Sequence, residues 1–373
     1  MSHQQRPEIS RWMSILVLAL AFATFSAFPA ALSAQSGGGF LDVTRQYKGL
    51  KGAWGFDFLP DGNLVITEKR GRMYVSDGSR LTRLSGLPNI HVDGQGGLLD
   101  VTVAKDFESS QEIFFTFVAK QASGSGTAAA VARLDTENAR LENVRVVFEM
   151  AEGSQGGRHF GSRIAEAADG TLFITLGDRG DRPSAQDLSN HNGSIVRINR
   201  DGSIPSDNPF TSGPTPEIWS YGHRNPQGLD ISESGTVWAV EHGAKGGDEV
   251  NLVARGNNYG WPVISYGVHY SGRSIGEGTT KDGMEQPEFF WDPSIAPSGL
   301  MVYEGAMFPE WQGDVFVGSL KFDYISRLSG SPLREVQQIE LSETRRVRDV
   351  AEGPDGSIWF ISEDRNAIYR LAR

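Results

Sequence analysis

The feature that most constrains the fold of this chain is a unit that recurs along it: a short polar turn, often Asp-Gly, followed by a β-rich apolar run. The four clear copies pair residues 56–62 with 64–67, 164–170 with 172–175, 229–235 with 237–240, and 350–356 with 358–361. Two weaker copies pair 101–111 with 113–117 and 313–314 with 315–318. Because a strand, an Asp-Gly turn and a second strand form a β-hairpin, the sequence predicts repeated hairpins.

The spacing of the copies, about 40 to about 80 residues, is typical of four-stranded propeller blades with insertions. Six copies without a convincing amphipathic helix between them favour an all-β chain folded as a six-bladed β-propeller. A β-sandwich or two stacked β domains are the alternatives, since hairpins alone do not close a ring. Residues 40–50 are expected to supply a strand that closes the ring with the C-terminal blade.

Two segments interrupt this repeat of hairpin units. Residues 121–128, rich in Gly, Ser and Ala, are expected to form a flexible hairpin tip. Residues 265–298, rich in Gly, Pro, Ser and aromatic residues, are expected to form a long loop over one face. Long ordered loops on a rigid scaffold often carry function, so the second segment is a candidate part of a site.

The N-terminus has the order of a secretory signal. Arg6 and Arg11 precede an apolar run over residues 15–28, and small residues follow up to Ala34. The run is short for a membrane span, which needs about 20 apolar residues; an uncleaved anchor is the alternative. We therefore predict a signal peptide over residues 1–34, a propeller domain over 35–373, a periplasmic or secreted protein, and no stable membrane insertion after cleavage.

Composition excludes several classes of function. The formal net charge is −11, and phosphate contacts need a basic face, so nucleic acid is not an expected partner. The absence of cysteine excludes thiol nucleophiles, iron–sulfur clusters and thiolate zinc sites. The sequence contains no Gly-x-Ser-x-Gly elbow, P-loop, His-Glu-x-x-His or strand-linked Gly-x-Gly-x-x-Gly, which argues against nucleotide and nicotinamide chemistry.

Two polar segments lie directly before predicted strands, where the face of a propeller gathers side chains. His159, within 156–163, has the chemistry of a general base, although a hydrogen-bonded structural histidine is an equal alternative. Arg224 and Asn225, within 221–228, offer a planar donor fork and an amide. The alternative is a loop stapled by arginine-to-carbonyl hydrogen bonds.

Two further segments suggest ion binding. Residues 241–249 and 256–262 combine carboxylates, glycines and bent backbone, which suit calcium without matching an EF-hand; a long solvated turn is the alternative. Arg346 and Arg348 alternate along an extended segment and should point to the same side, where they would repel unless an anion lies between them. With Lys321 and Arg224 they would form a pocket for a polyanion, the alternative being a charged outer face.

These segments together resemble the glucose/sorbosone dehydrogenase family, and within it the soluble aldose sugar dehydrogenases. The resemblance rests on residues 222–229, 248–252, 257–262 and 346–350, and extends over essentially the whole mature chain in the family's order. It implies a six-bladed propeller that carries pyrroloquinoline quinone (PQQ) above its axis, with calcium as a second cofactor.

The resemblance also implies a role for each matched residue. His159 corresponds to the catalytic base, and Arg224 and Asn225 correspond to contacts with the quinone oxygens. The remaining matches are Lys321, Arg346 and Arg348 as cofactor-binding cations, the carbonyls of Gly243 and Ala244 as calcium ligands, Glu249 and Tyr259 as a second calcium site, and Gln95 and Asp248 on the substrate side.

Four positions depart from the best-known soluble glucose dehydrogenases. His242 and Ala244 stand where glutamine and proline are expected, Arg158 stands where an acidic residue is expected, and Asp292 occupies the place of the aromatic substrate platform. The preferred sugar therefore does not follow from the resemblance.

The function implied is oxidation of an aldose at its anomeric carbon to a lactone, with electrons passed on to an external acceptor. A calcium-dependent propeller lactonase and a non-catalytic propeller that binds sugar or protein are the rival hypotheses. The sequence does not predict the oligomeric state or the physiological acceptor.

Overall fold

The computed structural model describes residues 41–151 and 153–373. The predicted signal peptide, residues 1–34, lies outside the described residues, as do residues 35–40. The unit that begins at Gly39 is nearly all β, and within the described residues its helices are limited to short segments: α1 (Phe107–Ser110), η1 (Arg182–Gln186) and η2 (Pro309–Trp311).

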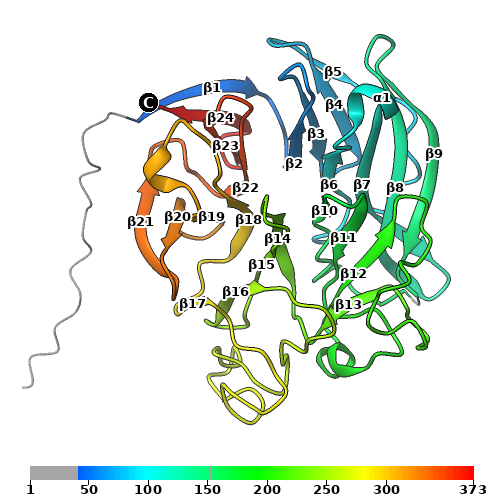
Figure 1. Cartoon of the computed structure of the whole chain (residues 1–373), viewed down its shortest axis with the longest axis vertical. Helices are drawn as coiled ribbons and strands as arrows, with labels where there is room; N and C mark the ends of the chain where they lie inside the picture. Colours follow the sequence, from blue (N-terminus) through cyan, green and yellow to red (C-terminus); the bar gives the residue numbers. More distant parts are fainter. Residues whose placement is uncertain (1–40, 152) are drawn as a thin grey trace, which may run out of the picture. The chain divides into compact units, whose positions relative to one another are not determined.

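Six four-stranded antiparallel sheets form the six blades of a β-propeller (Figure 1). Blade 1 contains β2 (Ala53–Phe58), β3 (Leu64–Glu68), β4 (Arg72–Ser76) and β5 (Leu81–Arg83). Blade 2 contains β6 (Leu98–Val103), β7 (Glu112–Gln121), β8 (Gly124–Asp135) and β9 (Arg140–Glu149). Blade 3 contains β10 (Ile164–Glu166), β11 (Thr171–Thr175), β12 (Ser194–Asn199) and β13 (Ile218–Tyr221).

The second half of the ring follows the same plan. Blade 4 contains β14 (Pro226–Ile231), β15 (Val237–Glu241), β16 (Asp248–Leu252) and β17 (Phe289–Trp291). Blade 5 contains β18 (Pro297–Val302), β19 (Val315–Ser319), β20 (Tyr324–Ser329) and β21 (Arg334–Glu340). Blade 6 contains β22 (Val347–Glu352), β23 (Ile358–Ser362), β24 (Ala367–Ala372) and the N-terminal strand β1 (Asp42–Lys48).

The predicted propeller and its closure are both confirmed. Five of the six repeat units correspond to the first two strands of one blade, and the sixth, 313–318, corresponds to the turn and second strand of blade 5. Strand β1 pairs with β24, with Asp42 opposite Ala372 and Lys48 opposite Ala367. The first strands of neighbouring blades contact one another in the cycle β2, β6, β10, β14, β18, β22 and back to β2. These first strands therefore surround the axis of the propeller.

One of the two interrupting segments differs from its prediction. The expected flexible tip at 121–128 is wrong for most of its length, because β8 begins at Gly124 and continues the pairing with β7. Ser125 and Ala128 are buried, since their small side chains fit where the sheet packs. The expected long loop is largely confirmed, although its last part contains β17 and the start of β18.

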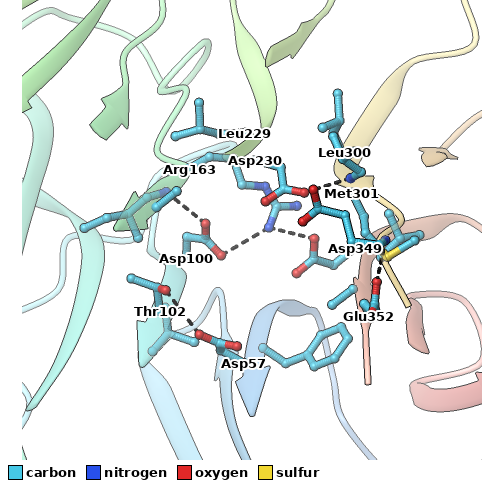
Figure 2. Close-up of a pocket in the computed structure, with 18 of the residues that line it drawn as sticks. Asp57, Asp100, Thr102, Arg163, Leu229, Asp230, Leu300, Met301, Asp349 and Glu352 are labelled. Carbon is cyan, nitrogen blue, oxygen red and sulfur yellow. Dashed lines mark hydrogen bonds and ion pairs between the residues drawn. The ribbon is translucent and has the colours of Figure 1, made fainter. Parts of the chain in front are cut away.

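Carboxylates on the first strands tie neighbouring blades together around the axis (Figure 2). Asp57 accepts the Val103 N–H at 2.7 Å, and Asp230 accepts the Val302 N–H at 2.7 Å. Burial, opposed by these hydrogen bonds, raises the pKa of Asp57 and of Asp230 to about 6. A backbone donor on the next blade thus replaces the water that each carboxylate loses.

Among the described residues, no helix has the length and apolar character that a membrane crossing requires.

Candidate functional site

A cavity on the axis gathers cationic and amide side chains from several blades. Its volume is about 210 Å³. We call it the basic cavity, and it is lined by Gly52, Ala53, Trp54, Lys69, Gln95, Asn225, Gln227, His242, Ala296, Leu320, Arg346, Arg348 and Glu363. Four of the residues predicted for the site therefore meet here: Gln95, Asn225, Arg346 and Arg348.

The two predicted arginines converge on one carboxylate. Arg346 Nε and Arg348 Nη2 each lie 3.0 Å from Glu363 Oε2. As expected, both side chains point to the same side and a carboxylate lies between them. The expected extended backbone is wrong at Arg346, which precedes β22 and has a left-handed φ of 51°. Burial, opposed by the charges of Arg348 and Arg346, leaves the pKa of Glu363 below its ordinary value, so the carboxylate is ionised.

Lys321, expected in the same cluster, is exposed and does not line the basic cavity. Its ammonium donates to the carbonyl of Ser294 at 3.1 Å and lies 4.6 Å from the centre of the Phe322 ring. Lys69, at the end of β3, lines the cavity instead.

His159 is held in a fixed orientation by two hydrogen-bond partners, one of which is itself fixed by further bonds. Its Nδ1 lies 2.6 Å from Asp178 Oδ1, and its backbone N–H donates to Gln95 Oε1 at 2.7 Å. Asp178 in turn accepts from Trp261 Nε1 at 2.8 Å and from the Gly180 N–H at 2.7 Å. Because Asp178 fixes the proton of His159 on Nδ1, the Nε2 lone pair is left as the acceptor.

The electrostatic surroundings keep His159 neutral. Burial lowers the pKa of His159 below its ordinary value, the charge of Arg224 lowers it further, and the hydrogen bond to Asp178 only partly opposes them. The side chain is 14% exposed. A neutral, oriented and accessible imidazole can remove a proton from a bound hydroxyl.

The backbone around His159 is tightly packed. His159 has a φ of 53°, and a Cβ on Gly177 would overlap the His159 carbonyl. Arg179 Nη2 donates to the Gly156 carbonyl at 2.8 Å, and its guanidinium lies 3.4 Å from the centre of the Phe160 ring. Close contacts with Gly177 and Arg179 thus fix the backbone of the segment that carries the imidazole.

Arg224 is buried with a donor that no described residue satisfies. Its backbone N–H donates to Glu241 Oε2 at 2.6 Å, its Nη1 donates to the His242 carbonyl at 3.1 Å, and it is 5% exposed. Within the described residues, Arg224 Nε has no partner. A buried orphan donor is unfavourable by about 1–3 kcal/mol, which points to an acceptor on a ligand.

Asn225 and His242 line the basic cavity next to Arg224. Asn225 Oδ1 accepts the Gly161 N–H at 3.2 Å, which links the His159 segment to the basic cavity. His242 Nε2 donates to the Pro297 carbonyl, 2.6 Å away. Burial, reinforced by the charge of Arg224, lowers the pKa of His242 to about 3, so this ring adds no charge to the wall.

The residues matched to calcium sites lie in the loop between β15 and β16 and around a second, smaller cavity. In the described part of the chain, no residue donates a hydrogen bond to the carbonyl of Gly243 or Ala244. Glu249 and Tyr259 line the smaller cavity, of about 10 Å³, which is close to the smallest space that admits one water molecule. Burial and the neighbouring charge of Glu241 raise the pKa of Glu249, an environment that favours a cation.

The searched residues, 41–151 and 153–373, contain no cluster of three or more His, Cys, Asp or Glu side chains that could hold a metal ion. Free backbone carbonyls and a buried carboxylate are nevertheless oxygen donors of the kind that calcium takes. The donor set therefore fits calcium only through backbone oxygens and Glu249.

Asp248, expected on the substrate side, is completely buried. Its carboxylate accepts from the Gly243 N–H at 2.8 Å, the Ile295 N–H at 2.8 Å and the Ser294 hydroxyl at 2.8 Å. These bonds join the loop after β15 to the loop before β18. Asp248 therefore positions the calcium-matched loop and does not face open space.

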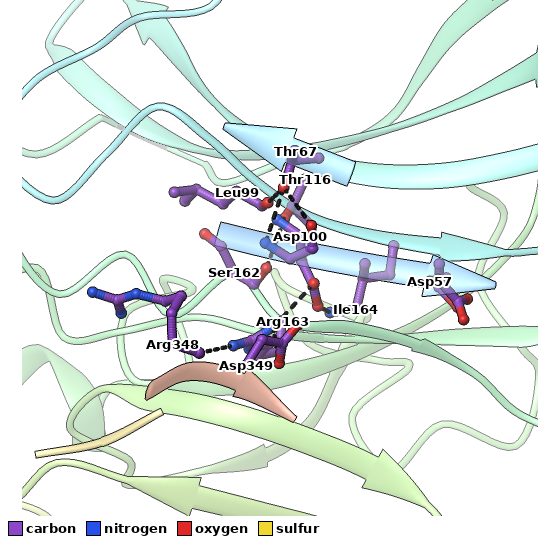
Figure 3. Close-up of polar contacts among 12 residues, drawn as sticks. Asp57, Thr67, Leu99, Asp100, Thr116, Ser162, Arg163, Ile164, Arg348 and Asp349 are labelled. Carbon is purple, nitrogen blue, oxygen red and sulfur yellow. Dashed lines mark hydrogen bonds and ion pairs between the residues drawn. The ribbon is translucent and has the colours of Figure 1, made fainter. Parts of the chain in front are cut away.

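Arg163 lies among polar partners that come from several blades (Figure 3). Its Nη1 contacts Asp100 Oδ1 at 3.1 Å and Asp349 Oδ1 at 2.9 Å, and its guanidinium lies 4.3 Å from the centre of the Trp54 ring. Its other donors reach the carbonyls of Gln227, at 2.7 Å, and Arg348, at 3.0 Å. One buried guanidinium thus holds five blades together and supports three residues of the cavity wall.

A second axial cavity lies on the other side of Arg163. We call it the acidic cavity; its volume is about 350 Å³, and its acidic lining residues are Asp57, Asp100, Asp230, Glu233, Glu304, Asp349 and Glu352. Arg163 lines the acidic cavity, while its contacts Trp54, Gln227 and Arg348 line the basic cavity. The axis is therefore divided into two compartments of opposite charge.

Sequence reasoning missed four residues of the site: Lys69, Asp178, Trp261 and Glu363. Asp178 lies three residues after Thr175, the last residue of β11, so a search of the polar residues just beyond each apolar strand would have found it. Lys69 and Glu363 also follow strands β3 and β23. Trp261 lies within 257–262, one of the segments that carry the resemblance, but the sequence predicted no role for it.

Comparison with known proteins identifies the relatives of this chain. The sequence profile of the Glucose / Sorbosone dehydrogenase family matches residues 50–371. Aldose sugar dehydrogenase YliI of Escherichia coli is 39% identical over 322 residues, which cover 83% of this chain and 87% of that protein.

Solved structures agree with this match. The soluble aldose sugar dehydrogenase from Escherichia coli in its apo form superposes with a TM-score of 0.85 at 38% identity, covering 89% of this chain and 99% of that one. The PQQ-bound aldose sugar dehydrogenase from Streptomyces coelicolor gives 0.73 at 26% identity, covering 89% and 98%. The chain belongs to the glucose/sorbosone dehydrogenase family.

Proposed function

We propose that this chain is an exported oxidoreductase that oxidises the anomeric carbon of aldose sugars to lactones, with PQQ and calcium as cofactors. The observation that carries the proposal is the pairing of an oriented, neutral His159 with Asp178, attached through Gln95 and Asn225 to the wall of the basic cavity. The family match and a PQQ-bound relative support the same function.

The chemistry of the basic cavity fits PQQ, which bears three carboxylates and a quinone. Arg346 and Arg348 would hold carboxylates of PQQ, because their guanidinium groups line the wall of the basic cavity. The orphan Nε of Arg224 and the amide of Asn225 would donate to the quinone oxygens. When bound, PQQ supplies a two-electron acceptor for hydride.

The residues of the chain supply the acid–base part of the reaction. His159 Nε2 would take the proton of the anomeric hydroxyl, while the anomeric hydrogen leaves as hydride and the sugar becomes a lactone. Asp178 holds the tautomer of His159 and stabilises the imidazolium that forms. Arg224 would stabilise negative charge that develops beside its guanidinium, and Gln95 fixes the backbone of the base.

Calcium, export and the fate of the electrons are parts of the same proposal. The carbonyls of Gly243 and Ala244 would contribute to an active-site calcium, with Glu249 and Tyr259 at a second site. Residues 1–34 would direct export and be removed, which leaves the domain over 35–373. The reduced enzyme would pass its electrons to an external acceptor.

The test uses purified protein, PQQ, calcium and a panel of aldoses, with reduction of an artificial dye as the readout. We expect sugar oxidation that needs both additions, and a His159→Ala variant that binds PQQ normally but loses activity by about 10²- to 10⁴-fold. His191→Ala is the matched control, because it removes a buried histidine whose partners are Ala151 and Glu217. Full activity of His159→Ala would refute the base assignment.

Absence of PQQ binding to the unaltered protein would refute the cofactor, and with it the reaction. Release of acid from lactones under calcium alone would then support the lactonase. Sugar binding without turnover of either kind would support the non-catalytic propeller.

A further inference from the structure

Lys69 is a cation of the basic cavity that neither the sequence motifs nor the family resemblance assigns to the site. It follows β3, and its half-buried side chain lines the cavity. Its ammonium donates to the carbonyl of Gly94, 3.0 Å away. Within the described residues, no carboxylate lies within 4 Å of that ammonium.

The backbone of Lys69 is fixed from both sides. Its N–H donates to the Gly52 carbonyl at 2.9 Å, and its carbonyl accepts the Leu98 N–H at 3.0 Å. A Cβ on Gly97 would overlap that carbonyl, so the strand of blade 2 approaches Lys69 as closely as a glycine allows. The side chain therefore starts from a rigid point on the cavity wall.

The position is electrostatically unfavourable for a lysine without an anionic partner. Burial lowers the pKa of Lys69, and the charges of Arg348 and Arg346 lower it further; only Glu363 opposes them. Of the described lining residues, Glu363 is the single acidic one, and it is already shared by both arginines. Three cations thus face one carboxylate, and the wall keeps a net positive charge that a polyanion would neutralise.

Resting on the proposed function, we propose that Lys69 contacts a carboxylate of bound PQQ directly and is the third cation of its binding site. Lys321, the third cation implied by the family resemblance, is exposed and bound to Ser294. Lys69 already faces the cavity and keeps a donor free, since an ammonium has three and the Gly94 carbonyl takes one.

The first experiment measures PQQ binding to the apo protein by equilibrium dialysis, with calcium present and no sugar or dye. We expect Lys69→Met to weaken binding by about 10- to 100-fold, since a hydrogen bond between charged groups is lost. Lys69→Arg should stay within about threefold of the unaltered protein, because it keeps the charge and the donors.

Lys48→Met is the matched control, because it removes an equal charge from an exposed position on β1. It should leave the affinity unchanged. A Lys69→Met variant that binds as tightly as Lys48→Met would overturn the proposal.

The second experiment needs no variant and so decides the matter if Lys69→Met fails to fold. The unaltered protein is treated with a lysine-methylating reagent with and without PQQ, and each lysine is followed by mass spectrometry. We expect PQQ to slow labelling of Lys69 several-fold and to leave Lys48 unchanged.

The failures of the two proposals are distinguishable. PQQ that binds the unaltered protein but does not protect Lys69 would overturn the role of Lys69 and leave the proposed function standing. Protein that binds no PQQ would overturn both.

Discussion

Replacement of Arg163 by methionine is expected to leave two carboxylates buried on the propeller axis without their shared cation. Arg163 is 4% exposed and contacts Asp100 and Asp349 at 3.1 and 2.9 Å. Removal of one member of such a buried cluster lowers the free energy of unfolding by about 3–5 kcal/mol. We therefore expect a loss of this size at pH 9.

The loss should shrink in acid, and its direction follows from the two aspartates. Burial, opposed by the charge of Arg163, raises the pKa of Asp349 to about 7 and also raises that of Asp100. Without Arg163 both pKa values rise further. The aspartates of the unfolded chain have pKa values of about 3.9 and are therefore ionised above about pH 5. In the same pH range the folded variant still keeps its buried aspartates protonated.

Where the folded state binds more protons, the free energy of unfolding falls as pH rises, by about 1.4 kcal/mol per pH unit for each carboxyl. For Asp349 this fall ends near pH 7 in the unaltered protein and continues to higher pH in the variant. The deficit of Arg163→Met should therefore grow by at least about 1 kcal/mol between pH 6 and pH 9.

The assay is equilibrium unfolding in urea, followed by tryptophan fluorescence at pH 6 and pH 9. Arg133→Met is the matched control, because Arg133 forms an ion pair with Glu142 at 2.9 Å while 46% exposed. Such an exposed pair contributes about 0–1 kcal/mol. A deficit for Arg163→Met that is the same at both pH values, or no larger than that of the control, would refute the reasoning.

Three further outcomes are expected. Asp178→Asn should lower kcat by about 10²- to 10⁴-fold in the dye assay, because the substitution disturbs the tautomer of His159. PQQ affinity should change little. An unchanged kcat would contradict this role of Asp178. The value of kcat/KM should fall in acid, with a midpoint below pH 6.5, because burial lowers the pKa of His159 below its ordinary value and the protonated ring cannot accept a proton. A midpoint above pH 6.5 would contradict the assignment of His159 as the base. A calcium chelator should lower the unfolding temperature of the unaltered protein, and Glu249→Gln should reduce that effect; equal responses of the two proteins would exclude Glu249 from a calcium site.

Much of the fold was predictable because its signals are local. A polar turn between two apolar strands is visible in a short window, and in blades 1, 3 and 6 the turn of the first hairpin is Asp-Gly. The segment at 124–128 was misread for the opposite reason. Its Gly, Ser and Ala residues suggest flexibility by composition, and only the packing of β8 within blade 2 shows why small side chains are needed there.

Site residues that lie within a sequence motif and carry the chemistry themselves could be predicted. Site residues that come from other segments and contact those motif residues only in the fold could not. His159 and Arg224 stood out by residue type and by their position before strands. Glu363 becomes part of the site only because the β22–β23 hairpin brings it between two arginines. No pattern in the sequence states which carboxylate will lie between them.

The pairing of β1 with β24 constrains when the propeller can close during synthesis and folding. The strand of the ring that leaves the ribosome first is completed only by the one that leaves last. Until β24 has been synthesised, β1 lacks its partner strand and its edge stays open to mispairing. Closure also joins segments far apart in sequence, which slows folding. A chain truncated directly after residue 366 should therefore be open and aggregation-prone, even though every residue assigned to the site would still be present.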